Sequence, residues 1–202
     1  MLEPVNTVLK AVLKLNLLKG DTALVIGQGP IGLMFTRLLE LRGIRVVASD
    51  LLDNRLKLAR RMGAHQAWRG DDERFEQKVL RIMGGRGVDA VVLAVPSDAI
   101  LPQAQRLARG GGQILLFADT RRGAGVPLDL ASICVDEKDL LGSYSSDFTL
   151  QQEVARLVFQ RKMDVRPLIS HRFELADTAQ AIRLAAQPAG NSLKILVSPK
   201  TD

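Results

Sequence analysis

The chain has few of the residue types that build metal centres and covalent cross-links. Its 202 residues include one cysteine and two histidines, His65 and His171. A single cysteine, Cys134, excludes an internal disulfide and a zinc site made of several cysteines. Because the histidines lie far apart in the sequence, we expect no metal cluster within this chain. We expect Cys134 to be a packing residue, and each histidine to lie at the surface or in a strand.

Long apolar runs are also missing. No stretch reaches the roughly 18 apolar residues that span a bilayer. Residues 1–14 lack a basic segment followed by a cleavable apolar one. We therefore expect no membrane contact and a cytoplasmic location.

The chain has few aromatic residues and no long basic run. Its formal net charge of +6 comes from 28 basic and 22 acidic residues, and 4% of the residues are aromatic. The basic residues are dispersed, with short pairs such as Arg60–Arg61 and Arg121–Arg122. This pattern argues against a nucleic-acid interface, which combines a basic stripe with stacking aromatics. The excess charge favours an anionic cofactor.

The most informative motif is a glycine-rich turn. The apolar residues 22–26 lead into GQGPIG at residues 27–32, and an amphipathic helix is predicted over 30–42. In this motif Gly27 permits the turn, Gly29 lets a pyrophosphate approach the backbone, and Gly32 brings the helix close to the strand. Pro30 is tolerated in a first helical turn, whose free amides bind anions.

An acidic residue follows at the spacing that dinucleotide binding requires. The strand predicted over 45–50 ends in Asp50, 18 residues after Gly32, and about 20 is typical for the carboxylate that binds the adenosine ribose. A carboxylate there repels a 2′-phosphate, so we expect NAD rather than NADP. The alternative is that Asp50 only caps a turn.

Strands and helices alternate over the first three quarters of the chain. Strands are predicted at 22–26, 45–50, 66–68, 88–95, 113–118 and 140–145, and helices at 30–42, 53–62, 71–83, 99–109 and 127–134. This alternation predicts an α/β fold with a doubly wound parallel sheet of about six strands and right-handed crossovers. The strand at 140–145 would lie at the sheet edge, where a second copy of the chain could pair with it.

The pattern changes after residue 147. Helices are predicted at 148–161 and 177–186, with strands at 169–173 and 193–197 that have no obvious partner. These strands form either a small α/β appendage or a sheet with material outside this chain. We expect a domain at 1–147, including an N-terminal junction helix at 4–17, and a separate segment at 148–202.

Several motifs together resemble the cofactor-binding Rossmann domain of medium-chain, zinc-type alcohol and polyol dehydrogenases. The resemblance runs colinearly over nearly the whole chain. It is carried by Glu3-Pro4 before a helix, KGDT, GQGPIG, DLLDNRLKLARRMGA, GVDAVVLAV, ARGGGQILLFA, DLLGSYSS and ISHRFELADTAQAI.

The resemblance implies positions for the parts of a bound NAD. Asp50 would bind the adenosine ribose and Arg55 would lie against the adenosine, while the loop after residues 92–95 would flank the ribose. The other cofactor-binding residues implied are Thr7, Gly27, Gly29, Pro30, Ile31, Gly32, Ala94, Val95, Phe117, Ala118, Asp119, Ser143, Tyr144 and Ser145. Of these, Thr7, residues 117–119 and residues 143–145 would face the nicotinamide.

The resemblance also points to what this chain does not contain. Family members carry a preceding catalytic domain, whose Cys and His-Glu ligands hold the catalytic zinc. Glu3 falls at the junction position, where relatives have a Cys or Glu at or near zinc. One carboxylate cannot hold a catalytic zinc, which needs about three protein ligands, and Glu3 equally suits the first turn of a helix. We therefore expect neither a catalytic residue nor a complete metal site here.

Three functions are compatible with these residues. The first is the cofactor-binding portion of an NAD-dependent alcohol or polyol dehydrogenase, inactive in alcohol oxidation by itself. The second is a non-catalytic NAD-binding module used for sensing or interaction. The third, a methyltransferase, is weaker, because the third glycine and its tight helix serve a pyrophosphate that methyl donors lack.

Overall fold

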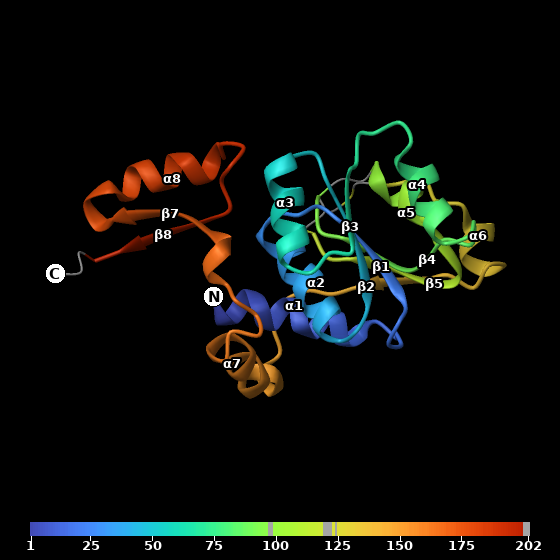
Figure 1. The fold of residues 1–202 in the computed structure, drawn as a ribbon, viewed down its shortest axis with the longest axis horizontal. Coiled ribbons are helices and arrows are strands. Elements are labelled where there is room, and N and C mark those ends of the chain that lie inside the picture. The colour runs from blue at the N-terminus through green and yellow to red at the C-terminus, as the bar shows by residue number, and fades with distance from the viewer. Residues whose placement is uncertain (97–98, 119–122, 124, 200–202) are drawn as a thin grey trace.

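A six-stranded parallel sheet forms the larger part of the molecule (Figure 1). The computed structural model describes residues 1–96, 99–118, 123 and 125–199. In the order β3-β2-β1-β4-β5-β6, the strands are β1 (Thr22–Ile26), β2 (Arg45–Asp50), β3 (Gln66–Arg69), β4 (Val88–Leu93), β5 (Ala108–Leu116) and β6 (Asp139–Gly142). The predicted α/β, Rossmann-type doubly wound sheet is confirmed, and this order places the reversal of winding between β1 and β4.

Helices cover both faces of the sheet. On one face lie α1 (Leu2–Lys14), α2 (Pro30–Leu41) and α3 (Asp53–Arg61), and on the other α4 (Phe75–Ile82) and α5 (Ile100–Leu107). Alternate side chains of β1 enter the two cores, with Ala23 and Val25 on one side and Leu24 and Ile26 on the other. Every residue of β1 and β4 is buried, which explains their nearly continuous apolar sequence.

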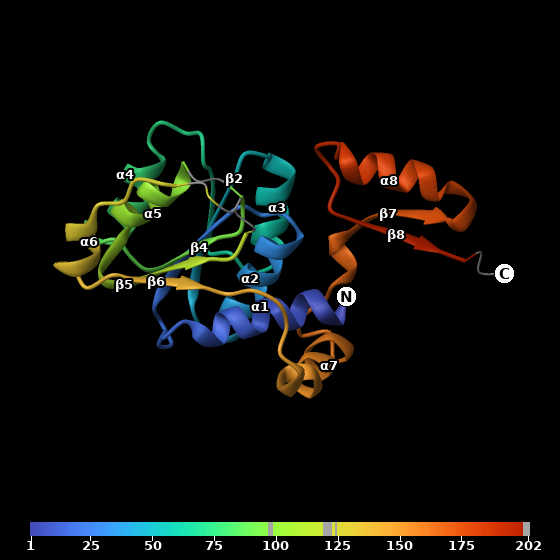
Figure 2. The same cartoon turned by 180° about the vertical axis from the view of Figure 1, so that it is seen from behind.

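The N-terminal helix connects the sheet to the segment that follows it. α1 packs against α2 and against α7 (Gln151–Phe159), and the two views in Figures 1 and 2 place α1 beside α7. The Asn6 side chain holds this junction. Its Nδ2 donates to the carbonyl of Asp147 at 2.9 Å, and its Oδ1 accepts from the Asp147 main-chain N–H at 2.8 Å.

The last part of the chain forms a small α/β unit of its own. Strands β7 (Ile169–Glu174) and β8 (Lys194–Ser198) pair with each other in parallel, and α8 (Thr178–Ala186) connects them. Figure 1 shows this unit to one side of the large sheet. Of the two predicted alternatives, the appendage is therefore correct, and the partner of each strand is the other strand.

Several predicted boundaries differ from the structure. The junction helix spans 2–14 instead of 4–17, because Leu15 is extended. The helix predicted from residue 71 begins at Phe75, because the Asp72 carboxylate accepts from the Arg74 main-chain N–H in a preceding turn. β4 ends at Leu93 and β6 at Gly142, so residues 94–95 and 143–145 follow the strands.

The three glycines at 110–112 belong to β5 and do not end a helix. Val88 of β4 pairs with Ala108, whereas Ala90 pairs with Gln113. Between these pairs, one residue of β4 stands opposite four of β5, residues 109–112, so the glycines form an irregularity in the strand. The sequence pattern suggested a helix end because consecutive glycines mark both features.

Cys134 is exposed, so the prediction that it packs in the interior is wrong. It ends the short helix α6 (Leu130–Cys134), none of whose residues is buried. His65 is exposed and His171 lies in β7, as predicted. Within the described residues, no group of three or more His, Cys, Asp or Glu side chains could hold a metal ion.

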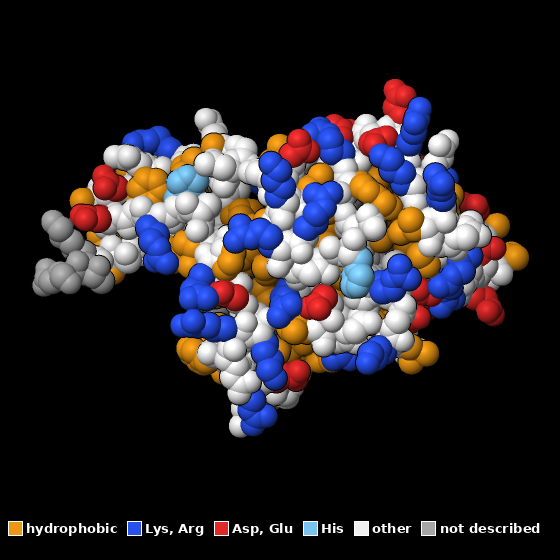
Figure 3. All heavy atoms as spheres, viewed as in Figure 1, with side chains coloured by type: hydrophobic (Ala, Val, Ile, Leu, Met, Phe, Trp, Pro, Cys, Tyr) orange, Lys and Arg blue, Asp and Glu red, His pale blue; other side chains and the backbone are white. Residues whose placement is uncertain are grey.

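Basic side chains do not gather in one patch on the visible face of the molecule. On the face shown in Figure 3, Lys and Arg side chains are spread over several elements and are mixed with acidic ones. No helix in the described part of the chain has the length and apolar character needed to cross a membrane.

Candidate dinucleotide-binding site

A cavity lies at the carboxyl ends of the central strands. Its volume is about 510 Å³. Residues from the ends of β1, β2 and β4 and from the starts of α3 and α5 line it, including Gly27, Asp50, Leu52, Arg55, Val95 and Ile100. Open parallel sheets bind ligands at this position, next to the point where the winding reverses.

The three glycines of the turn meet different surroundings. Gly27 has φ +91°, and a Cβ there would lie 2.2 Å from Val95 Cγ1. A Cβ at Gly32 would lie 1.7 Å from the Gly27 carbonyl oxygen. At Gly29, by contrast, no atom of the described residues would lie within 4 Å of a Cβ. Gly27 and Gly32 are therefore required by the fold itself, and Gly29 leaves space that a ligand can enter.

The start of α2 offers main-chain donors to this space. Gly29 is the N-cap, with an extended backbone, and Pro30 occupies the first helical turn. The first α-helical hydrogen bond runs from the Leu33 N–H to the Gly29 carbonyl at 2.9 Å. No side chain among the described residues caps this helix. The N–H groups of its first turn, including those of Ile31 and Gly32, are thus suited to an anion such as a pyrophosphate.

Asp50 is held in place at the end of β2. Its Oδ2 accepts from the Gln28 main-chain N–H at 2.6 Å, and its Oδ1 accepts from the Leu52 N–H at 2.9 Å. The residue is 8% exposed and borders the cavity. Each carboxylate oxygen can accept more than one hydrogen bond, so Asp50 retains acceptor capacity for a ligand hydroxyl.

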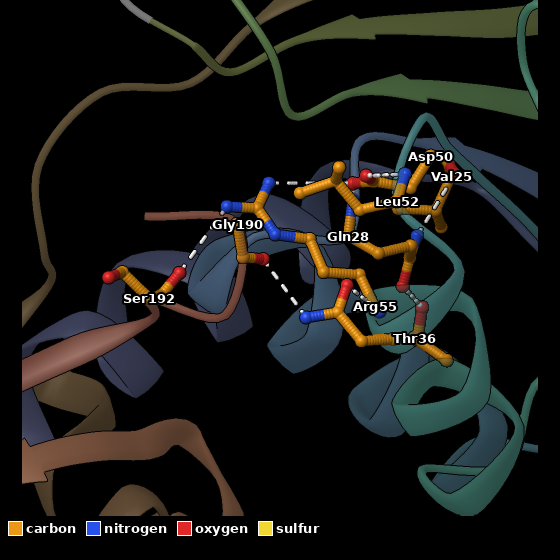
Figure 4. Close-up of polar contacts among 9 residues, drawn as sticks. Val25, Gln28, Thr36, Asp50, Leu52, Arg55, Gly190 and Ser192 are labelled. Atoms are coloured by element: carbon orange, nitrogen blue, oxygen red, sulfur yellow. Dashed lines mark hydrogen bonds and ion pairs between the residues drawn. The ribbon is translucent and has the colours of Figure 1, made fainter. Parts of the chain in front are cut away.

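Arg55 lies between this carboxylate and the C-terminal unit (Figure 4). One terminal nitrogen is 3.7 Å from Asp50 Oδ2, and the other donates to the Ser192 carbonyl at 3.4 Å. Next to it, Asn54 Nδ2 donates to the Gly190 carbonyl at 2.9 Å. The Arg55 Nε is buried without a partner in the described chain. The segment 190–192 therefore lies against the start of α3, beside the cavity.

A second group of predicted residues lies at the ends of β5 and β6. The Phe117 and Ala118 main-chain N–H groups donate to the Leu93 carbonyl, and the Phe117 ring contacts Phe35 edge-on, with centroids 4.9 Å apart. The Ser143 N–H donates to the Leu116 carbonyl at 3.2 Å. Ser143 is buried, whereas Tyr144 and Ser145 are exposed, and Ser145 has φ +64°.

Thr7 lies on α1, in the neighbourhood of this group. Lys10, one turn further along α1, donates to the Tyr144 carbonyl at 3.0 Å. The Thr7 hydroxyl donates to Glu3 Oε1 at 2.8 Å and is also 3.1 Å from the Glu3 carbonyl. The Glu3 carboxylate is therefore engaged within the first turns of its own helix, a position that suits an acidic residue.

The structure thus divides the predicted site residues into two groups. Gly27, Asp50, Arg55 and Val95 line the cavity, with Ala94 beside Val95 at the end of β4. The residues that do not line it are Thr7, Phe117, Ala118, residues 29–32 at the start of α2 and residues 143–145. Asp119 lies outside the described residues. Gln28, Thr36 and Ser192 were not among the predicted site residues. Only Gln28 carried a signal in the sequence, because it lies inside the glycine motif.

Fold and site together define a dinucleotide-binding domain. The zinc-binding dehydrogenase family matches residues 30–160, and the chain belongs to this family. It corresponds to the cofactor-binding domain of these dehydrogenases.

The individual relatives agree with this assignment. An alcohol dehydrogenase of Cupriavidus necator is 29% identical over 196 residues, covering 96% of this chain and 54% of the relative. A zinc-binding dehydrogenase from Sinorhizobium meliloti 1021, solved with NADP, is 27% identical and has a TM-score of 0.87 over 98% of this chain and 58% of that one. A short chain alcohol dehydrogenase from Escherichia coli CFT073, solved with NADH, shares the fold with a TM-score of 0.86 at 23% identity, over 96% of this chain and 57% of that one.

Coverage is the main difference from these relatives. The chain spans about half the length of the curated relatives it matches. Neither the sensing module nor the methyltransferase finds support in relatives such as the alcohol, L-threonine 3- and sorbitol dehydrogenases.

Proposed function

We propose that this chain is the cofactor-binding portion of an NAD-dependent alcohol or polyol dehydrogenase. The observation that carries the proposal is the position of Asp50, held by main-chain amides at the border of the cavity beside the glycine turn. The nicotinamide supplies the hydride chemistry, and the protein binds and orients the dinucleotide. The α2 amides hold the pyrophosphate and Asp50 accepts from the adenosine ribose hydroxyls.

The preference for NAD over NADP rests on charge. A 2′-phosphate on the ribose would place its negative charge next to the Asp50 carboxylate, which is costly in a partly desolvated cavity. Among the described residues, Arg55 contacts Asp50 and also donates to the Ser192 carbonyl, so its charge is already engaged. Because relatives solved with NADH and with NADP both exist, the preference has to be tested on this chain.

The remaining site residues are proposed for other parts of the cofactor. Ala94 and Val95 flank the adenosine ribose, while the nicotinamide is faced by Thr7, Phe117, Ala118, Asp119, Ser143, Tyr144 and Ser145. Phe117 and Ala118 follow β5 and Ser143 follows β6. Their main-chain position at the carboxyl edge of the sheet supports this proposal.

Zinc does not fit the residues described here. Glu3 is a single carboxylate engaged by Thr7, and the described chain has no cluster of three potential ligands. We propose that zinc and the alcohol or polyol substrate bind only where a catalytic domain is also present, so that this chain alone does not oxidise alcohols.

The domain organisation and assembly are also proposed. Residues 1–147 form the dinucleotide-binding domain, and residues 148–202 pack on the catalytic domain in relatives. Strand β6 is the last strand of the sheet, so its outer edge can pair with a second copy of the chain. A sedimentation measurement that found only monomer would contradict this pairing. We also propose a cytoplasmic location.

Titration with NADH tests the main proposal. Asp50→Ala should weaken NADH binding at least about tenfold, because a hydrogen bond to a charged group contributes about 1.5–3 kcal/mol. Asp53→Ala is the matched control, since it removes the same charge three residues later, where the side chain is 70% exposed. Equal NADH affinity of the Asp50→Ala variant and the unaltered chain would contradict the assignment.

A further inference from the structure

Gln28, the residue between the first two glycines of the turn, is completely buried. Its exposed fraction is 0%, although its side chain is polar. Both ends of the side-chain amide are satisfied. Nε2 donates to the Val25 carbonyl at 3.0 Å, and Oε1 accepts from the Thr36 hydroxyl at 2.9 Å (Figure 4).

This amide connects two elements that flank the turn. Val25 lies in β1 and Thr36 in the second turn of α2, and Thr36 is also 0% exposed. Burying polar groups is unfavourable unless they are paired, and a fully paired buried network makes its surroundings rigid. The side chain of Gln28 therefore fixes the backbone of the turn relative to the strand before it and the helix after it.

The backbone of the same residue makes the contact with Asp50. The Gln28 N–H donates to Asp50 Oδ2 at 2.6 Å, and both groups are buried. The Leu52 N–H binds the other carboxylate oxygen. Two amides thus determine how the carboxylate is oriented at the border of the cavity, and one of them belongs to the residue whose side chain is locked.

We propose that Gln28 is a positioning residue for the ribose-binding carboxylate. Its buried side chain, held by Val25 and Thr36, directs its main-chain N–H at Asp50 Oδ2 and so keeps the remaining acceptor sites of the carboxylate available to the ligand. The proposal rests on the role proposed above for Asp50. It goes beyond the glycine motif, which requires nothing of the residue at position 28.

The test is a set of three variants. Gln28→Met keeps the length of the side chain and removes both of its hydrogen bonds. In Gln28→Met the Thr36 hydroxyl is left without its acceptor. The double variant Gln28→Met, Thr36→Val removes this hydroxyl as well, and the loss of stability should therefore be smaller. Val79→Ala, in α4 on the opposite face of the sheet, is the control for destabilisation alone, since Val79 is fully buried in the other core.

Affinities for NADH and NADPH are measured at a temperature at which every variant is folded. Both Gln28 variants should bind NADH about tenfold more weakly, the loss equivalent to one hydrogen bond to a charged group. NADPH affinity should stay equal or rise, because a carboxylate that can turn away repels the 2′-phosphate less. The ratio of the two affinities should therefore shrink in the Gln28 variants and stay constant in Val79→Ala.

Amide hydrogen exchange without cofactor gives a second readout. The N–H at position 28 should be protected in the unaltered chain and exchange at least about tenfold faster in Gln28→Met, because the hydrogen bond to Asp50 opens more often. An unchanged affinity ratio, or an equal change in Val79→Ala, would overturn the proposal, as would retained protection at position 28. If the unaltered chain binds neither dinucleotide, the proposed function fails, and the exchange rate still decides whether Gln28 positions Asp50.

Discussion

The carbonyl oxygen of Gly27 occupies the place where a side chain on Gly32 would begin, since a Cβ there would lie 1.7 Å from it. The first turn of α2 is thus in direct contact with the end of β1. This contact brings the amides of the first turn of α2 to the carboxyl ends of β1 and β4. Gly27 and Gly32 are therefore needed for folding, whereas Gly29 is needed for ligand binding.

Gly32→Ala should destabilise the protein strongly. The added methyl group meets main-chain atoms, which cannot move away without displacing the turn, so the cost should be about 3 kcal/mol or more, at the upper end of overpacking effects. Thermal unfolding followed by circular dichroism measures the loss. An unfolding midpoint equal to that of the unaltered chain would mean that the helix packs less closely on the strand than described.

Gly29→Ala should separate binding from folding. No described atom lies within 4 Å of the added Cβ, and the φ of −66° suits alanine. The unfolding midpoint should therefore stay the same or rise slightly. NADH affinity should fall about tenfold or more, because the methyl group occupies the space that the pyrophosphate needs. Calorimetric titration that found full affinity would place the pyrophosphate elsewhere.

Asp89 should control stability in acid. It is 2% exposed, and its carboxylate accepts from the Thr22 N–H at 2.8 Å and from Arg109 Nε at 2.7 Å. Burial raises the pKa of Asp89, but these two hydrogen bonds and the charge of Arg86 outweigh it and hold the pKa below 3.8. The stabilisation is therefore complete above pH 3.8 and is lost as the pH falls through the lower folded-state pKa.

Asp89→Asn should lower the free energy of unfolding at pH 7 by about 2 kcal/mol, since a neutral amide replaces the buried carboxylate that accepts hydrogen bonds from the Thr22 N–H and from Arg109. The variant should also lose less stability than the unaltered chain when the pH falls below 3.8. Asp71→Asn is the control, because its ion pair with Arg69 is exposed and should contribute little. Urea unfolding at several pH values distinguishes the two, and parallel pH curves for Asp89→Asn and the unaltered chain would contradict the prediction.

Asn54→Ala should release the segment beside the cofactor cavity. Its amide holds the Gly190 carbonyl at 2.9 Å and lies outside the cavity lining. Hydrogen exchange at residues 188–193 should become faster while exchange in the large sheet does not change. Asn16→Ala, remote from this segment, should leave those rates as they are. Unchanged protection after Asn54→Ala would contradict this role of the Asn54 amide.

The sequence predicted the large sheet well because its signals are local. Gly27 and Gly32 are required by a backbone angle and by a close contact within a few residues, and apolar strands such as 88–93 must be buried on both faces. The spacing of Asp50 from the turn follows from the length of one helix and one strand. The predicted helix and strand boundaries were less accurate where one residue type is found in two kinds of structure. The glycines at 110–112, for example, were expected to end a helix but form an irregularity in β5.

Other features depend on segments that meet only in the folded chain. The pairing of β7 with β8 joins strands separated by a helix, and neither strand alone indicates its partner. Cys134 is exposed because no residue of α6 is buried. The two partners of Arg55 come from β2 and from the segment before β8. No periodic pattern in the sequence encodes contacts between segments so far apart in the chain.

By itself, the sequence determined the glycine turn, the acid at the end of the second strand and the alternation that makes the sheet parallel, because each follows from the conformations open to a short stretch of chain. Only the tertiary structure decided that Gln28 is buried, that Arg55 joins the cavity to the C-terminal unit and that the last two strands pair. These features depend on contacts between distant residues, and packing of the whole chain selects them.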